Sequence, residues 1–574
     1  MTLGLFRSAV AGILLGVGVA SPVVAGEVLL IHGHIYTGVA NSPWAEAISV
    51  NDSHIDALGT TDQLLKHRQP DAQIIDLRGH TVIPGIVDSH LHMLYGAIAL
   101  HGFNLSTPEA SITPDQPRIL VKRVKEYAAS HPADRILFGR ADFATVAPFA
   151  PTHALLDSAV SDRPVIVHNT SEHALWLNAK ALALAGITDQ PVADANEERY
   201  IIRDASGHPT GVLLEAAMEV MERVVWKTLP LEDQLSLLRD ASHYLNRYGI
   251  TSVVNATGNL REIKLFGTLR DRGELTVRTR TAFGSVAVPH RLTPQFLADL
   301  EEARTRYHDD WVSANLVKFF ADGSTGLYPP LVYAPADFKA LVLELDRRGY
   351  QLMTHAQRDD TVHLALDAYE NAVRINGPRD RRLRIEHDLV IAESDMPRYS
   401  QVGVIAVMQP ALCCSEVGTN WDPRVTVPSD RWHSLASLGV VLGFSSDWPC
   451  VWPPNPFTNV QQAVTRAVWQ SKDTANVTGE PLDGAAQAGA RRTGKIYSPQ
   501  ERITVRQAID AYTRGSAYAA FMDDRVGSLQ VGKLADIAVL SQDVFKVPPG
   551  QIDKTRVVLT MVGGKVVYDD LQLH

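Results

Sequence analysis

Eight short apolar segments, separated by stretches with helical periodicity, most restrict the folds open to this chain of 574 residues. They lie at residues 85–92, 249–256, 275–284, 315–320, 350–356, 383–387, 402–409 and 439–447. Amphipathic patterns separate several of them; before Gly249, for example, a predicted helix carries Leu231, Leu235, Leu238 and Leu245 on one face. Eight alternations of strand and helix predict an α/β fold, a (β/α)8 TIM-like barrel with functional residues at the carboxyl ends of its strands. A doubly wound sheet is the alternative, but no glycine-rich dinucleotide loop follows a first strand.

Both ends of the chain differ in pattern from the central segments, because short β-like runs alternate with turns there. Residues 26–84 and 524–574 share this pattern, so we predict one small β-sandwich domain built from both termini. The barrel then occupies residues 85–523. Within it, residues 94–248 separate the first two barrel strands and form a long insertion of the kind that often shapes a binding site. A length that would allow about four domains therefore reduces to two.

Composition and charge narrow the classes of partner. With 45% hydrophobic and 21% charged residues, the chain resembles an ordinary globular protein with a large core, which excludes a wholly disordered, collagen-like or polytopic membrane protein. The formal net charge of -10 provides no basic excess. We therefore expect no nucleic acid partner and no anionic membrane surface, but a small-molecule substrate. The sequence leaves a homo-oligomer open.

Residues 1–25 have the composition of a secretory signal peptide. Arg7 precedes an apolar run at residues 8–24, and Ala20 or Ala25 could end a cleavable segment. The run is rich in glycine and alanine and short for a membrane span, although an uncleaved anchor is the alternative. We expect a periplasmic or secreted protein without stable membrane insertion after cleavage.

Three cysteines are too few for a disulfide framework in a chain of this length. Cys413 and Cys414 are neighbours, which could pair with each other only under strain, and Cys450 stands apart. No CxxC spacing suggests a metal site. We therefore expect the cysteines to pack in the interior.

Metal-binding chemistry is indicated first by His90 and His92, which end the first barrel segment. Residues two apart on a strand point to the same face, so both imidazoles can reach one cation. Alone the motif is weak, because about one such pair is expected by chance among 21 histidines. A second pair, His32 and His34, lies in the predicted small β domain, and we interpret it as coincidental.

The later barrel segments make chance a poor explanation. His355, His387 and Asp447 each end a predicted strand, and Lys318 lies in another. All therefore belong at the carboxyl face of the barrel, where active sites lie. Imidazoles with a carboxylate suit zinc or a similar divalent ion and leave a coordination position open.

These motifs resemble the metal-dependent amidohydrolase superfamily, and specifically its amidohydrolase-3 branch, which includes N-substituted formamide deformylase-like proteins. The resemblance follows the family's order along nearly the whole chain after residue 25. It rests on VIPGIVDSHLHM, RPVIVHNTSEHALWLNAKAL, PTGVLLE, GITSVVNA, LVKFFADGSTG, THAQRDD, RIEHDLV, GVIAVMQP, FSSDWPC, QAIDAYTRGSAYAAF and VGSLQVGKLADIAVL.

The resemblance implies a binuclear metal centre, with one or two divalent ions per chain and zinc as the expected metal. Asp447 would be both a ligand and the catalytic proton shuttle. A carboxylated Lys318 would bridge the ions; the alternative is a lysine paired with Asp322 or another acid. The implied metal ligands are His90, His92, Lys318, His355, His387 and Asp447.

The implied activity is hydrolysis of a C–N bond in an amide, formamide or cyclic amide by a metal-activated hydroxide. The same site could instead hydrolyse an ester, lactone or phosphoester. A further alternative is a non-catalytic metal-binding or regulatory protein that retains the fold, although such a protein has no need of a proton shuttle. Predicted substrate-binding residues are His173, Trp176 and Glu215 in the insertion, and Trp448 after the last strand; packing outside the site is the alternative for each.

Overall fold

The computed structural model describes residues 26–105, 116–141, 143, 151–169, 173–284, 292–322, 331–414, 429–451, 453–470 and 491–570. The predicted signal segment, residues 1–25, lies outside them. In the part of the chain that is described, no helix is long and apolar enough to cross a membrane.

Eight parallel strands form the central sheet, in the order β21-β20-β19-β18-β17-β16-β15-β8. They are β8 Ile86–Leu91, β15 Ile250–Gly258, β16 Arg278–Phe283, β17 Val312–Phe320, β18 Gln351–Ala356, β19 Arg384–His387, β20 Ile405–Met408 and β21 Leu442–Phe444. The two outer strands also meet, since the Ser89 hydroxyl donates to the carbonyl of Phe444 over 2.9 Å. The predicted barrel is confirmed, and each strand overlaps its predicted segment.

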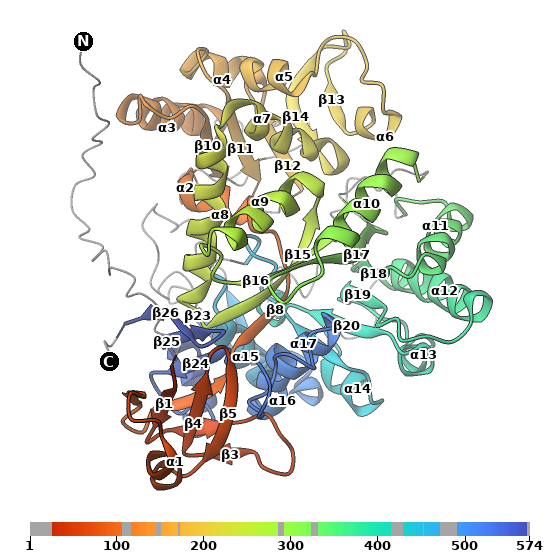
Figure 1. Ribbon diagram of the computed structural model, residues 1–574. Helices are drawn as coiled ribbons and strands as arrows, with labels where there is room; N and C mark the ends of the chain where they lie inside the picture. The colour runs from red at the N-terminus through yellow and green to blue at the C-terminus, as the bar shows by residue number, and fades with distance from the viewer. Residues whose placement is uncertain are drawn as a thin grey trace, which may run out of the picture.

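Helices cover the outside of the sheet (Figure 1). In α8, Leu231–Asn246, the predicted apolar face is buried at Leu235, Leu238 and Leu245, whereas Leu231 in the first turn is 51% exposed. The other helices of the barrel are α2 Met93–His101, α9 Leu260–Asp271, α10 Pro294–Arg306, α11 Pro335–Arg347, α12 Asp359–Asn376, α13 Met396–Val402, α14 Trp432–Ser437, α15 Pro456–Thr465, α16 Val505–Asp510 and α17 Ser516–Ala519.

Two further sheets form the small β domain, one of N-terminal strands alone and one that combines both ends of the chain, as Figure 1 shows where red and blue strands lie together. One has the order β5-β4-β1-β6, and the other has the order β26-β25-β24-β7-β2-β3. The pairing that joins the two ends of the chain is between β7 and β24, which are antiparallel, with Val82 opposite Val539. Their bounds are β1 Val28–Ile31, β2 His34–Tyr36, β3 Trp44–Ala45, β4 Ala47–Asn51, β5 His54–Gly59, β6 Gln73–Asp76, β7 Thr81–Pro84, β24 Ile537–Leu540, β25 Val557–Val562 and β26 Lys565–Asp569, with helix α1 Thr61–His67 beside them.

The insertion has a sheet of its own, in the order β13-β14-β12-β11-β10-β9. The sequence GHPTGVLLEAAME forms strand β14 and then the 3-10 helix η2, Glu215–Glu219. Its pairing with β12 explains this, because it satisfies the backbone of an apolar run too short for a buried helix. The elements are β9 Phe103–Asn104, α3 Gln116–Ser130, β10 Leu137–Ala141, α4 His153–Ala159, β11 Val165–Asn169, β12 Ala174–Leu177, α5 Ala179–Ala185, α6 Ala195–Glu198, β13 Ile201–Arg203, β14 Pro209–Leu214 and α7 Val220–Thr228.

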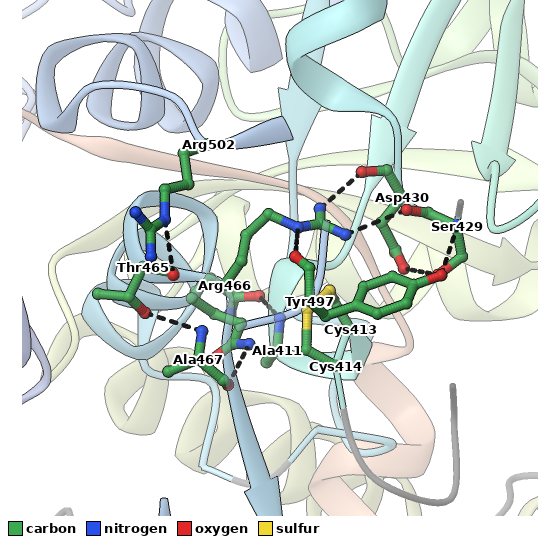
Figure 2. Close-up of a disulfide and its surroundings, with 12 residues drawn as sticks. Ala411, Cys413, Cys414, Ser429, Asp430, Thr465, Arg466, Ala467, Tyr497 and Arg502 are labelled. Carbon is green, nitrogen blue, oxygen red and sulfur yellow. Dashed lines mark hydrogen bonds between the residues drawn. A yellow bond between two sulfur atoms is a disulfide. The ribbon is translucent and has the colours of Figure 1, made fainter. Parts of the chain in front are cut away.

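Cys413 and Cys414 are buried as expected, but they are joined in a disulfide, so the expectation of simple packing was wrong for this pair (Figure 2). Cys414 adopts a left-handed backbone conformation, with φ 67°. Beside the disulfide, Arg466 donates to the carbonyls of Tyr497 and Asp430 over 2.7 and 2.8 Å. Cys450 is partly buried and is not part of this pair.

A buried ion pair connects the barrel to the small β domain. Arg278 at the start of β16 donates through Nε and Nη2 to the two carboxylate oxygens of Asp536, over 2.8 and 2.9 Å. Both side chains are 2% exposed. Breaking such a pair from one side is costly, because the remaining charge stays buried without its partner.

We expect Arg278→Met to lower the free energy of unfolding by about 3–5 kcal/mol, measured by urea denaturation, because Asp536 would be left as a buried, unneutralised carboxylate. Arg272→Met is the matched control. Arg272 pairs with Glu232 at the surface, where the side chains are 37% and 64% exposed, so its loss should leave the free energy of unfolding nearly unchanged. Equal effects of the two substitutions would contradict the role given to the buried pair.

Candidate metal centre

Four histidines converge at the carboxyl ends of three barrel strands. His90 lies in β8 and His92 directly after it, while His355 lies in β18 and His387 ends β19. The ring of His90 lies 5.5 Å from that of His92 and 4.9 Å from that of His387, centroid to centroid. His387 in turn lies 4.4 Å from His355. The four imidazoles therefore form one continuous group.

Asp447 and Lys318 complete the group. Asp447 follows β21, and its backbone N–H donates to the carbonyl of His90 over 2.8 Å. Its Oδ1 lies 3.2 Å from Nε2 of His92 and 3.4 Å from Nε2 of His90. Lys318 in β17 is fully buried, with Nζ 3.5 Å from the same His90 nitrogen. The structure thus brings all six predicted metal residues together.

Each of the four imidazoles is held at its Nδ1 atom by a fixed oxygen. Such contacts orient metal-binding histidines and leave Nε2 for the ion. The pairs are His90 with Glu386 at 2.6 Å, His92 with Thr257 at 2.8 Å, His355 with Asp322 at 2.6 Å and His387 with Gln409 at 2.8 Å. Sequence reasoning missed Glu386, Thr257 and Gln409. In the sequence these residues are marked only by their positions near the ends of strands. Many residues without a role in the centre have such positions.

Asp322 was considered in the sequence only as an alternative partner of Lys318. In the structure its carboxylate contacts His355 and also accepts hydrogen bonds from the Thr361 hydroxyl and the Gln357 N–H. It therefore belongs to the surroundings of the centre, where it positions His355.

Burial keeps the centre in protonation states suited to a cation. It lowers the pKa values of His90 and His355 well below the usual range and that of His387 to about 3, so these rings are neutral. Burial also lowers the pKa of Lys318 to about 8. Burial opposes ionisation of Asp447, but the hydrogen bond from His92 and nearby positive charge hold the pKa of this carboxyl below its ordinary value.

The donor set fits a divalent metal ion. Ligand atoms of His90, His92 and Asp447 all lie within 4.8 Å of one another, close enough to share one ion. Nε2 of His387 is buried and has no hydrogen-bond partner among the described residues. A neutral, buried imidazole nitrogen without a partner is costly unless it binds a Lewis acid.

The predicted substrate-binding residues divide into two groups. His173 lies beside the centre, with its ring 6.0 Å from that of His355, and contacts Glu215. Trp176 lies three positions further along, in β12, hence on the opposite face. It is fully buried inside the insertion and donates to the carbonyl of Thr152, so it belongs to the core and does not line the centre.

Trp448 is also a packing residue. It is fully buried, its ring stacks 5.8 Å from that of Tyr244 in α8, and it approaches Gly96 in α2 so closely that a Cβ there would lie 2.0 Å from the indole. Its side chain therefore fills the space between two barrel helices. The pair His32 and His34 lies in the small β domain, where His32 contacts Asp76 and His34 stacks on Trp44.

A family model described as the amidohydrolase family, Amidohydro_3, matches residues 73–568. The chain belongs to the amidohydrolase family. The predictions of this family and of a metal-dependent amidohydrolase are therefore confirmed.

Relatives of similar length cover nearly the whole chain. It is 26% identical to Protein LONG AFTER FAR-RED 3 of Arabidopsis thaliana, over 95% of this chain and 92% of that one. It is 24% identical to N-substituted formamide deformylase of Arthrobacter pascens, over 95% and 98%. An uncharacterized metal-dependent hydrolase from Pyrococcus furiosus has the same fold, with a TM-score of 0.65, 23% identity, and coverage of 91% of this chain and 100% of its own.

We expect Glu386→Gln to weaken divalent-metal binding by about 10- to 100-fold, because the neutral amide no longer stabilises His90 as a ligand. Chelator competition on the purified protein measures this directly. The control is His363→Gln, whose Nδ1 lies 3.1 Å from Asp395 but whose side chain is 57% exposed on the outside of the barrel. Unchanged metal affinity in Glu386→Gln would show that this carboxylate has no part in the centre.

Proposed function

We propose that this protein hydrolyses the C–N bond of a small amide, formamide or cyclic amide, with one or two zinc ions held by the six residues of the centre. The observation that carries the proposal is the position of Asp447. Its carboxylate touches Nε2 of both His90 and His92 and so lies at the ligand cluster itself. A carboxylate there can serve as both a ligand and a proton carrier.

A bound divalent ion would supply an acidified water and polarise the substrate carbonyl. The imidazoles would hold the ion, and Asp447 would accept the proton that the attacking water loses. Asp447 then returns this proton to the nitrogen of the scissile bond. The second transfer is needed because an amine leaves poorly until it is protonated.

Lys318 is proposed to act as a carboxylated lysine that bridges two ions. Carboxylation joins the neutral amine to carbon dioxide and releases a proton. Burial favours this neutral form by lowering the pKa of Lys318 to about 8. The competing role, a pair with Asp322, is less well supported because that carboxylate is already bonded to His355 and Thr361.

The proposed cleavage of a C–N bond is supported by the similarity to N-substituted formamide deformylase of Arthrobacter pascens, which matches this chain over nearly its whole length. A metal-activated water could also attack ester, lactone and phosphoester substrates. A non-catalytic role is disfavoured by the complete ligand group with Asp447 in contact with it.

We expect Asp447→Asn to reduce hydrolysis by at least about 100-fold while the protein remains folded, because the amide cannot carry the proton. The assay uses a panel of N-formyl amines, N-acyl amino acids, cyclic amides, lactones and phosphotriesters. Circular dichroism and metal analysis, with one or two ions expected per wild-type chain, accompany each variant. Wild-type turnover of lactones or phosphotriesters alone would overturn the C–N assignment.

Export to the periplasm or beyond is a further part of the proposal. It is supported by the apolar run after Arg7 and by the Cys413–Cys414 disulfide, since disulfides are common in oxidising compartments and rare in the cytosol.

We expect the full chain, produced in a Gram-negative bacterial host, to accumulate in the periplasmic fraction with its new N-terminus after Ala20 or Ala25. N-terminal sequencing of that fraction measures the cleavage. The control is a chain that starts at residue 26, which should stay in the cytosol. Uncleaved full chain in the cytosol would rule out the signal.

A further inference from the structure

Arg280 in β16 points into the interior of the barrel. Met353 lies two positions before His355 in β18, and alternate residues of a strand share a face, so Met353 faces inward as His355 does. Ala282 packs against Met353 in one apolar cluster, and Arg280 precedes Ala282 by two positions. The side chain of Arg280 is therefore on the inward face, nearer to the amino ends of the strands than the metal centre, and it is 7% exposed.

Residues 519–522 close this end of the barrel interior. Gln351, the first residue of β18, donates through Nε2 to the carbonyl of Ala519 over 2.8 Å. The guanidinium of Arg280 lies 5.5 Å from the centroid of the Phe521 ring. We call this region the barrel floor; it consists of Arg280, Gln351, Arg384 and residues 519–522.

The guanidinium of Arg280 forms no ion pair with a carboxylate in the described part of the chain. Its Nη2 donates to the amide oxygen of Gln351 over 3.1 Å, and its buried Nε has no hydrogen-bond partner there. Burial, together with the like charges of Arg384 and Arg382, lowers the pKa of Arg280 to about 9, so the group is still charged at neutral pH. A buried charge without a counter-charge is costly.

A second buried donor without a partner belongs to Arg384 in β19. Its Nε and Nη2 donate to the two oxygens of Glu386 over 2.8 and 2.9 Å. The three nitrogens of a planar guanidinium radiate evenly from one carbon, so this pairing turns Nη1 away from Glu386. Nη1 is buried and has no hydrogen-bond partner among the described residues. The floor thus contains two cationic groups, each with an N–H donor that the protein does not use.

The chemistry of the floor favours a small anion over a water molecule. Water could accept hydrogen bonds from both arginines, but it cannot neutralise the charge of Arg280. Phosphate, sulfate and carboxylates have several oxygens that each need a donor, whereas the unused N–H donors lie at Arg280 and Arg384, beside the apolar cluster of Leu316 and Met353. A monatomic, monovalent anion needs the fewest donors, and chloride is the common one.

We propose that the barrel floor binds a chloride ion, held by Nε of Arg280 and Nη1 of Arg384. The ion supplies the negative charge that Arg280 lacks, and it fixes the guanidinium of Arg384 from the side opposite Glu386. Because Glu386 orients His90, Arg384 connects the chloride site with the metal centre. The ion takes no part in hydrolysis.

Diffraction from crystals of the wild-type protein grown in sodium chloride, recorded on both sides of the chlorine absorption edge, identifies the ion directly. We expect a peak in contact with the two guanidinium nitrogens whose anomalous signal appears only above the edge. A peak without this change would be water or another group, and it would overturn the proposal. An empty floor would overturn it equally.

Thermal unfolding in mixtures of sodium chloride and sodium gluconate at constant ionic strength measures the binding in solution. A ligand bound only by the folded protein raises the midpoint, and above its dissociation constant we expect a rise of about 1 °C for each tenfold increase in chloride. Arg280→Met should abolish this dependence. In gluconate alone the variant should be at least as stable as the wild type, because an apolar side chain replaces a buried charge that has no partner.

Arg381→Met is the matched control. Arg381 is 5% exposed, and its Nε donates to Asp346 over 2.8 Å, so its loss should lower the midpoint but leave the chloride dependence unchanged. A wild type whose midpoint does not respond to chloride would contradict the proposal, as would an Arg280→Met variant that responds like the wild type. Neither measurement uses a substrate, so the outcome is independent of the proposed function.

Discussion

The hydrogen bond between Glu386 and His90, 2.6 Å long and fully buried, is the contact on which the metal centre depends. Glu386 is itself held by Arg384, whose Nε and Nη2 donate to its two oxygens over 2.8 and 2.9 Å. The same guanidinium donates to the carbonyl of Ser89 over 2.6 Å, so a strand on the far side of the centre is tied to β19. One charged network thus orients a ligand and joins two barrel strands.

A second buried carboxyl supports the turn that carries Asp447. Asp88 accepts hydrogen bonds from the backbone N–H groups of Ser446 and His90, over 3.1 and 3.3 Å. Burial raises the pKa of this carboxyl to about 7. Asp88 contacts Ser446, which precedes Asp447, and also His90. It therefore connects the first and last strands where the barrel closes. The contacts of Asp88 that fix the position of Asp447 therefore also help to close the barrel.

The barrel strands and the convergence of the six candidate metal residues were predictable because two simple rules suffice for them. Buried parallel strands are continuous apolar runs, and functional residues follow at their carboxyl ends. Glu386 and Gln409 were not predictable, since what distinguishes them is a contact with a histidine on another strand. The orientation of Trp176 away from the centre was not predictable, because the sequence does not show where β12 begins and hence on which face each residue lies. Cys413 and Cys414 were misjudged because pairing of adjacent cysteines depends on a local backbone conformation, here the positive φ of Cys414.

The insertion resembles the barrel in where its polar residues lie. It therefore places side chains beside the centre although its own strands supply none of the six candidate ligands. In both parts, polar residues lie near or just beyond the ends of strands, where side chains can converge. His173 and Glu215 are held by the pairing of β12 with β14, and no barrel strand takes part in that pairing. The side chains of the centre and this insertion pair are therefore held by separate sheets, and the edge contact between His173 and His355 brings the two together.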